Sequence, residues 1–112
     1  MKILMLTWEY PPRVVGGISR VVYDVSHRLI KDGHKVTVIT YRDGKVPYFE
    51  EDKGVKVHRI DNYMINPNNF IEWIMQMNFA MVAKANKIIA EEGTFDIIHA
   101  HDWLVAYAAK AL

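Results

Sequence analysis

The feature that most constrains the fold is a short apolar run that leads through a loop rich in proline and glycine into a helical pattern. Residues 2–7 are mainly apolar, and the run breaks at a proline pair and then at a glycine pair, residues 16–17, as a buried strand that enters a loop does. From Ile18 onwards apolar residues recur at steps of three and four, and Gly33 stands where a helix C-terminal cap belongs. Residues 35–40 are rich in β-branched side chains. This part of the chain therefore predicts a strand, a helix and a parallel partner strand.

The rest of the chain continues the alternation of strands and helices. Residues 55–60 alternate apolar and polar side chains, which is typical of a half-exposed strand at the rim of a sheet. Residues 61–69, with a proline and several asparagines, predict a loop. Residues 70–92 carry apolar side chains at helical spacing and predict the longest helix. A fourth strand is expected over residues 95–99 and a last helix over residues 104–112.

This order of elements predicts an α/β fold, the first half of a Rossmann-like parallel sheet with helices on both faces. Right-handed crossovers make 3-2-1-4 the natural strand order. In that order the first and fourth strands are neighbours whose connections leave towards opposite faces, so a crevice opens at their carboxyl ends. The two unusual loops, residues 8–17 and 99–103, follow these two strands. A binding site is expected between them.

Composition excludes several classes of partner and site. The 14 basic and 13 acidic side chains give a formal net charge of +1, so no electrostatic footprint for nucleic acid or for an anionic membrane stands out. The chain contains no cysteine, which excludes disulfides and thiolate metal clusters and fits a reducing compartment. No signal peptide and no apolar stretch of about 20 residues is recognisable, so we expect a soluble, cytoplasmic protein without a membrane span.

Gly16 and Gly17 are candidates for a phosphate site. Glycine lets the backbone approach a ligand closely, and the free amides and dipole of a helix N-terminus favour an anion. The alternative is that the pair only makes a tight turn, and position alone does not separate the two interpretations. The loop has neither the Gly-x-Gly-x-x-Gly spacing of dinucleotide-binding proteins nor the lysine of a P-loop, which disfavours oxidoreductases and nucleotide hydrolases.

His99, His101 and Asp102 form a second candidate cluster. On an extended segment the two histidines point the same way, yet no third ligand is recognisable nearby, so a metal site is disfavoured. The alternative is a sugar site in which His101 forms hydrogen bonds, Asp102 is a fixed acceptor and Trp103 offers a packing or stacking surface. Asp102 could equally act only as the cap of the following helix.

Three motifs, in this order, resemble known glycosyltransferases. The run WEYPPRVVGGISR at residues 8–20 and the run GHKVTVIT at residues 33–40 are similar to the opening of retaining nucleotide-sugar glycosyltransferases of families 4 and 5. The run HAHDW at residues 99–103, which follows the strand FDII, is similar to the His-x-His-Asp-Trp stretch of glycogen and starch synthases. The motifs cover most of the chain except residues 42–94.

The resemblance implies a GT-B architecture, in which two Rossmann-like domains face each other across a cleft. The glycine pair would then approach the pyrophosphate of the donor, and His101 would contact the transferred sugar near its anomeric carbon. Arg13 and Asp102 would complete the donor-phosphate and substrate site. Bacterial glycogen synthases carry a lysine where this sequence has Val14, so the resemblance leaves a basic phosphate contact from this loop open. Most donor contacts in these enzymes, including a pair of glutamates, belong to the second domain.

The resemblance therefore predicts that residues 1–112 are the N-terminal part of a hexosyltransferase. The parent enzyme would transfer a hexosyl group, in the first place a glucosyl group, from a nucleotide-diphosphate sugar to a glycan acceptor. Transfer would retain the anomeric configuration and would need neither a cofactor nor a metal. The C-terminal donor-binding domain is expected to be absent and this chain to be inactive alone. The alternative is a non-catalytic α/β nucleotide-binding or interaction module, which could share the topology.

The expected truncation also predicts an exposed edge. Residues 95–99 would form an interior strand in a complete sheet, and a strand that lacks a neighbour attracts another chain. The last helix, residues 104–112, would lack part of its packing surface. Self-association of the chain through this side is therefore expected as a consequence of truncation.

Overall fold

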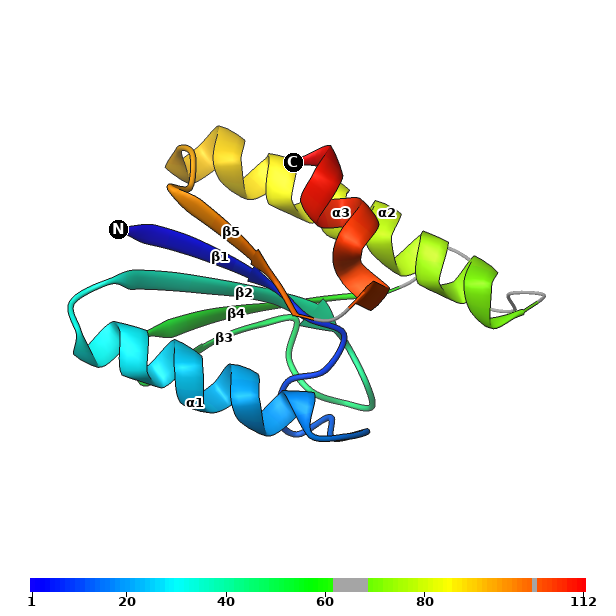
Figure 1. Ribbon diagram of the computed structural model, residues 1–112, viewed down its shortest axis with the longest axis horizontal. Coiled ribbons are helices and arrows are strands. Elements are labelled where there is room, and N and C mark those ends of the chain that lie inside the picture. The colour runs from blue at the N-terminus through cyan, green and yellow to red at the C-terminus, as the bar shows by residue number, and fades with distance from the viewer. Residues whose placement is uncertain (62–68, 102) are drawn as a thin grey trace.

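The computed structural model describes residues 1–61, 69–101 and 103–112. A five-stranded sheet forms the centre of this part of the chain, and helices cover its two faces (Figure 1). The strands are β1 (Lys2–Leu6), β2 (Lys35–Tyr41), β3 (Phe49–Asp52), β4 (Val55–Ile60) and β5 (Ile97–Ala100), and the helical elements are α1 (Ile18–Lys31), α2 (Phe70–Glu92), the 3₁₀ turn η1 (Trp103–Val105) and α3 (Ala106–Ala111). The predicted α/β class is confirmed.

The strand order is β3-β4-β2-β1-β5, and the four strands other than β3 run parallel to one another. The predicted order 3-2-1-4 corresponds to β4-β2-β1-β5 and is confirmed for these four strands. The expectation that residues 55–60 form the rim of the sheet is wrong, because β3 pairs antiparallel with the outer side of β4. Val55 and Val57 are fully buried because they belong to the hydrophobic core under α1.

β3 is the element that the sequence prediction missed. Only Phe49 is apolar in this strand, whose other residues are acidic, so hydrophobic periodicity gives no signal for it. The signal lies in the turn instead. Lys53 and Gly54 connect β3 to β4 and both have a positive φ, at 50° and 94°. Two consecutive positive φ angles are typical of the type I′ turn of a two-residue β-hairpin.

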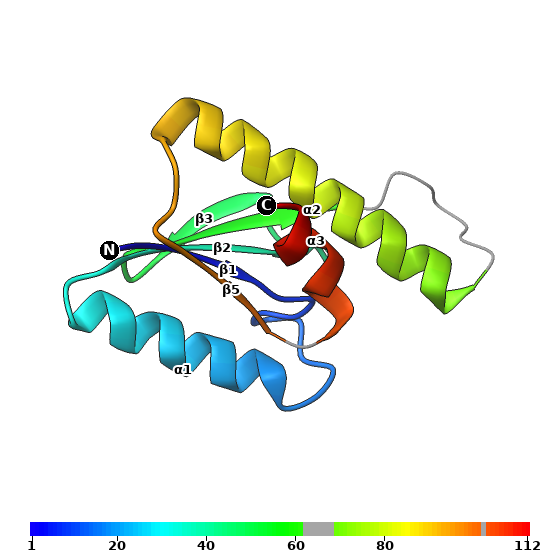
Figure 2. The same cartoon turned by 45° about the horizontal axis from the view of Figure 1, so that its top comes forward.

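Side chains of β1 alternate between the two faces of the sheet, and each face has its own hydrophobic core. Ile3 and Met5 belong to the core under α1, whereas Leu4 and Leu6 belong to the core under α2 and α3. Figure 2 shows α1 on one side of the sheet and α2 with α3 on the other. All four side chains are exposed by 4% or less, so β1 is buried on both faces, as a central parallel strand is.

Capping residues in the sequence mark both ends of α2. The helix begins after Asn69, whose side-chain oxygen accepts a hydrogen bond from the Glu72 amide at 2.8 Å. It ends before Gly93, whose φ of 91° lies in the region that favours glycine. The predicted bounds, residues 70–92, are confirmed. Most of the loop predicted before it, residues 61–69, lies outside the described residues.

No helix in the described part of the chain combines the length and the apolar character needed to cross a membrane. At the edge of the sheet away from β3, β5 pairs with β1 alone among the described strands, and Ile97 is 43% exposed. The single helix predicted over residues 104–112 is instead the 3₁₀ turn η1 followed by the short helix α3. Self-association through this side of the molecule stays a prediction.

The side chain of Asn78, a residue of α2, holds the segment after β5 against this helix. Its side chain is 1% exposed and donates hydrogen bonds to the carbonyl oxygens of Ile74 and Leu104 at 2.8 and 2.7 Å. It also accepts a hydrogen bond from the Ala108 amide at 3.0 Å. The first amide N–H groups of a helix have no partner within the helix, and Asn78 accepts the hydrogen bond of one of them, the Ala108 amide. One buried amide therefore holds α3 in place.

Asn78→Ala should lower the free energy of unfolding by about 2–4 kcal/mol, because two buried backbone groups outside α2 lose their partner. Asn86→Ala is the matched control, since Asn86 is exposed on the same helix and the change in helix propensity is the same. Urea denaturation of both variants measures the difference. A loss no larger than that of the control would show that these hydrogen bonds contribute little.

Candidate functional site

The carboxyl ends of β1 and β5 bring together the two loops that the sequence analysis selected. Leu6 pairs with Ala100 in the parallel register, and the His101 amide continues the ladder by donating to the Leu6 carbonyl oxygen at 2.9 Å. The loop after β1 leads to α1 on one face, and the segment after β5 leads to α3 on the other (Figure 1). A crevice between connections that leave towards opposite faces is the usual ligand site of such a sheet, so this edge is the candidate site.

The loop after β1 is folded around the fully buried side chain of Glu9. Its carboxylate accepts hydrogen bonds from the amides of Val15 at 2.7 Å, Gly16 at 3.0 Å and Ser19 at 2.7 Å. These amides lie at the N-terminus of α1, where unpaired N–H groups and the helix dipole favour negative charge. Glu9 thus takes a place that an external anion would otherwise occupy. Sequence reasoning missed it, although a single acid among aromatic residues and prolines is the available signal.

The glycine pair lies in the exposed part of this loop. Gly16 donates its amide to Glu9, whereas the Gly17 amide donates to no acceptor within the described part of the chain. Gly17 has φ −78° and ψ −14°, and neither glycine has a positive φ, so the backbone does not require glycine here. A Cβ atom added at either position would meet nothing within 4 Å. The loop leaves room for a ligand to approach, and the choice between a phosphate site and a turn stays a prediction.

Arg13 packs among aromatic rings, and its guanidinium group forms an ion pair with an acidic side chain. Its guanidinium carbon lies 5.1, 5.0 and 6.0 Å from the ring centroids of Trp8, Tyr41 and Trp73. It donates hydrogen bonds to the Asp43 carboxylate at 2.8 Å and to the Trp8 carbonyl oxygen at 3.0 Å. These contacts do not join it to the glycine pair. Its phosphate contact therefore stays a prediction, and in this structure its charge is compensated internally.

His101 is buried, at 9% exposed, and its ring centroid lies 4.0 Å from that of His99. The two rings point the same way, as predicted for alternate residues of an extended segment. Burial, and after it the charge of His99, lower the pKa of His101 to about 4, so the imidazole is neutral at neutral pH. Its Nε2 atom is buried and has no hydrogen-bond partner among the described residues. A neutral ring with an unpaired nitrogen is suited to a hydrogen bond with a polar ligand.

Two other predicted members of this cluster cannot be placed beside His101. Asp102 lies outside the described residues, and so does the side chain of Trp103. Their roles as acceptor, cap or stacking surface stay predictions. Across residues 1–61, 69–101 and 103–112, no group of three or more histidine, aspartate or glutamate side chains is arranged to hold a metal ion.

Arg59 is another residue that sequence reasoning missed. It is 2% exposed and donates hydrogen bonds to the carbonyl oxygens of Pro11 at 3.1 Å and Pro47 at 3.2 Å. It also donates to the Glu50 carboxylate at 2.6 Å, so it joins β4 to β3 and to the loop after β1. These partners lie 9 to 48 residues away along the chain, so no local pattern indicates them.

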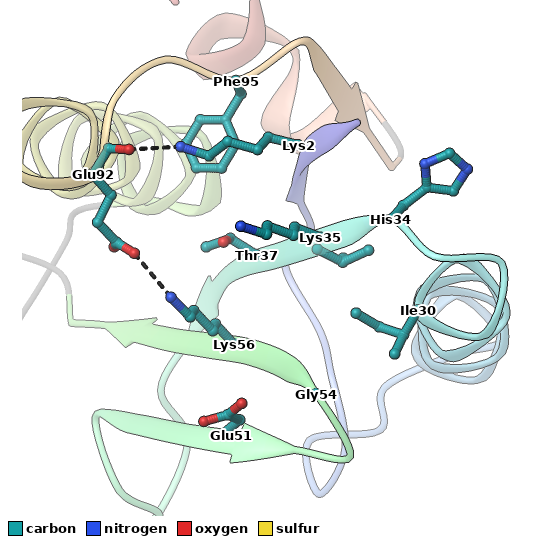
Figure 3. Close-up of a pocket in the computed structure, with 11 residues that line it drawn as sticks. Lys2, Ile30, His34, Lys35, Thr37, Glu51, Gly54, Lys56, Glu92 and Phe95 are labelled. Carbon is teal, nitrogen blue, oxygen red and sulfur yellow. Dashed lines mark hydrogen bonds and ion pairs between the residues drawn. The ribbon is translucent and has the colours of Figure 1, made fainter.

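A cavity of about 520 Å³ lies at the opposite, amino-terminal edge of the sheet (Figure 3). Lys2 donates to the carbonyl oxygen of Glu92 at 2.7 Å, and Lys56 donates to the Glu92 carboxylate at 2.9 Å. The hydrogen bond from Lys56 lowers the pKa of Glu92. These contacts attach the end of α2 to the starts of β1 and β4. Because ligands of parallel α/β sheets bind at the carboxyl ends of the strands, the candidate site remains at the other edge.

Comparison with known proteins finds relatives over the whole chain. Residues 15–112 match the family described as Glycosyltransferase Family 4. The chain is 37% identical over 112 residues to an uncharacterised glycosyltransferase of Methanocaldococcus jannaschii, and 36% identical over 126 residues to a glycogen synthase of Mycobacterium tuberculosis. Both alignments cover 100% of this chain but only 27% and 30% of the relatives. The chain thus spans less than a third of the length of these relatives.

A solved structure has the same fold. A sucrose-phosphate synthase from Thermosynechococcus elongatus matches 98% of this chain and 29% of its own length, with a TM-score of 0.75 at 19% sequence identity. At this identity the likeness concerns the fold alone. It confirms the Rossmann-like architecture that the sequence predicted for a GT-B glycosyltransferase domain.

Glu9→Gln should loosen the start of α1, because the amide side chain has one acceptor oxygen in place of two and carries no charge. Hydrogen bonds to charged groups contribute about 1.5–3 kcal/mol, so exchange of the Gly16 and Ser19 amides should become about 10-fold faster or more. Hydrogen exchange followed by NMR measures this. Glu91→Gln, on the exposed side of α2, is the matched control. Equal protection in both variants would show that the loop does not need the charge.

The lowered pKa of His101 should make the free energy of unfolding depend on pH. In the unfolded chain the imidazole binds a proton near its usual pKa of 6.5, so the unfolded state binds more protons than the folded state between about pH 6.5 and pH 4. The stability contributed by the neutral ring is present above this range and should be lost as the pH falls through it. His101→Gln should reduce this dependence in urea denaturation at about pH 7 and about pH 4.5. Identical pH dependence in both proteins would contradict the buried neutral state.

Proposed function

We propose that this chain, which belongs to glycosyltransferase family 4, forms the N-terminal part of an enzyme that transfers a hexosyl group from a nucleotide-diphosphate sugar to a glycan. A second Rossmann-like domain faces the carboxyl edge of the sheet and holds most of the donor, and the chain alone is inactive. The transfer retains the anomeric configuration, and the proposal includes no cofactor and no metal ion. A glucosyl group is the first candidate, because one of the relatives is named a glycogen synthase.

The observation that carries this proposal is the state of His101. Its backbone is fixed to the end of β1 by the hydrogen bond to Leu6, while its ring is buried and neutral. Its Nε2 atom has no partner within the described residues. A sugar hydroxyl can both donate to and accept from an imidazole, so it can satisfy this nitrogen in either tautomer. We therefore assign His101 to the transferred sugar, where it helps to place the anomeric carbon.

The unpaired amide of Gly17 supports the proposal that the donor pyrophosphate lies at the N-terminus of α1. This amide lies at the N-terminus of α1 and has no acceptor within the described residues, and a Cβ atom added at Gly17 would meet nothing within 4 Å. The amides of Val15, Gly16 and Ser19 are already used by Glu9. The loop therefore offers a close backbone approach to the donor and only part of an anion site.

The lengths of the relatives support a second domain. This chain corresponds to 27% of the Methanocaldococcus glycosyltransferase and to 30% of the Mycobacterium glycogen synthase. In open α/β sheets the ligand lies outside the carboxyl ends of the strands, so one side of it is left for another domain to cover. Donor contacts absent from the described residues are then contributed from that domain.

In the full-length enzyme, His101→Ala should lower kcat by about 100-fold, because a contact to the reacting sugar is lost. His101→Phe keeps the volume of the ring without its nitrogens and should show a similar loss. His99→Ala is the control, since His99 is exposed beside it. Transfer from a nucleotide sugar to a glycan, measured with the thermal stability of each variant, tests this.

Unchanged kcat in both His101 variants would contradict the role assigned to this residue. A wild-type enzyme that neither binds a nucleotide sugar nor transfers its hexose would favour the non-catalytic interaction module. A fall in kcat that follows the fall in thermal stability across all three variants would point to a structural role for the histidine pair.

A further inference from the structure

A pocket of about 470 Å³ lies at the same carboxyl edge of the sheet as His101, between the loop after β1, the end of β2 and the start of α2. Pockets of a few hundred Å³ lined by aromatic rings and a small number of polar groups are typical of small-ligand sites. We call it the aromatic pocket, and its main lining residues are Trp8, Arg13, Tyr41, Asp43, Phe70 and Trp73.

The rings of the aromatic pocket form a surface that is open to solvent. Phe70 stacks on Trp73 with centroids 5.9 Å apart and an interplanar angle of 9°, and Trp8 meets these rings edge-on at 6.5 and 6.1 Å. Tyr41 meets Trp73 edge-on at 4.9 Å. Phe70 is 53% exposed, and the other three rings are half-buried. Trp8, Tyr41 and Trp73 pack against the core, and Phe70, stacked on Trp73, offers apolar surface to a ligand.

The charges of the aromatic pocket disfavour ionic ligands. Arg13 lies over three of the rings and occupies the position that a cationic ligand would take. Its charge is paired with Asp43, whose carboxylate is 58% exposed at the rim of the pocket. Of the described residues that line the pocket, Arg13 is the one that is basic, and because it is paired with Asp43 it does not supply a free positive charge for a phosphate. The same carboxylate can accept hydrogen bonds from neutral hydroxyl groups.

We propose that the aromatic pocket binds a hexose unit of the glycan acceptor. The proposal rests on the glycosyl transfer proposed above and names the acceptor side of that site. One face of a pyranose ring consists of C–H groups that pack on aromatic rings, and its rim carries hydroxyl groups that donate to a carboxylate. Phe70 supplies the exposed ring and Asp43 the exposed carboxylate.

The position of the pocket agrees with this assignment. Tyr41 is the last residue of β2, and Trp8 follows β1 by two residues. β1 lies between β2 and β5 in the sheet, and β5 leads directly to His101. A glycan seated in the aromatic pocket therefore lies along the same edge as the histidine that we assign to the transferred sugar.

Binding is tested on the whole chain by NMR of the indole N–H signals of Trp8 and Trp73, with maltotriose and mannotriose as neutral probes and adenosine diphosphate as the anionic comparison. At least one trisaccharide should shift both signals in a saturable way, and the nucleotide should leave them unchanged. These signals report on the pocket without any substitution, so the test does not depend on the folding of a variant.

Phe70→Ala removes the most exposed ring of the pocket, and Phe49→Ala is its matched control, because Phe49 is 50% exposed on β3 at an edge of the sheet. Phe70→Ala should weaken trisaccharide binding by about 3- to 10-fold, the range expected for one aromatic contact. In the full-length enzyme it should raise the KM for the glycan by a similar factor and leave the KM for the nucleotide sugar unchanged. Phe49→Ala should change none of these values.

The outcomes separate this proposal from the proposed function. If neither trisaccharide shifts the indole signals, or if Phe70→Ala leaves the KM for the glycan unchanged in an enzyme that transfers sugar, the pocket assignment is wrong and the transferase stands. A shift caused by the nucleotide alone would also overturn the pocket assignment. If the trisaccharides bind but the full-length protein transfers no sugar, the transferase is wrong and the pocket is a glycan-binding site on its own.

Discussion

The structure of the loop after β1, at the edge of the sheet that carries the candidate site, depends on one buried charge, the carboxylate of Glu9. A buried carboxylate is strongly unfavourable unless it is hydrogen-bonded, and the amides of Val15, Gly16 and Ser19 provide these bonds. In turn the carboxylate satisfies amides at the start of α1 that the helix cannot pair by itself. The path of the loop and the start of the helix are thus fixed by the same contacts. The exposed position of Gly17 is their consequence.

Two arginines hold the same loop from the side of the sheet. Arg59 binds the carbonyl oxygen of Pro11 from β4, and Arg13 binds that of Trp8 from within the loop. Each guanidinium is also paired with a carboxylate, Glu50 for Arg59 and Asp43 for Arg13. Charge-assisted hydrogen bonds of this kind are strong when they are shielded from water, and the side chains of Arg59 and Arg13 are 1% and 14% exposed. The loop is therefore preorganised by contacts inside the chain.

Features that depend on near neighbours in the sequence could be predicted, whereas features that depend on distant partners could not. The bounds of α2 follow from periodicity and from Gly93, and the order of the four parallel strands follows from the handedness of crossovers. The histidine pair was found from its spacing after a strand. The contacts of the Arg13 side chain could not be predicted, because its partner Asp43 lies 30 residues away and the surrounding rings come from three segments of the chain. β3 was missed because its acidic residues give no hydrophobic periodicity, and the local signal, the two-residue turn at Lys53 and Gly54, was not used.

The charge balance of this edge bears differently on the sugars and on the phosphates of the proposed substrate. The positive charges of Arg13 and Arg59 are offset by Asp43 and Glu50, and the helix N-terminus is largely occupied by Glu9. Among the described residues, this edge offers a ligand the neutral imidazole of His101, the Gly17 amide and a set of aromatic rings, which are groups that suit sugar hydroxyls and ring faces. The two arginines that hold the loop after β1 are already paired with acids, so neither is left to compensate a pyrophosphate. We therefore expect recognition of the sugars to lie mainly on this sheet and neutralisation of the phosphates to lie mainly on the second domain proposed above.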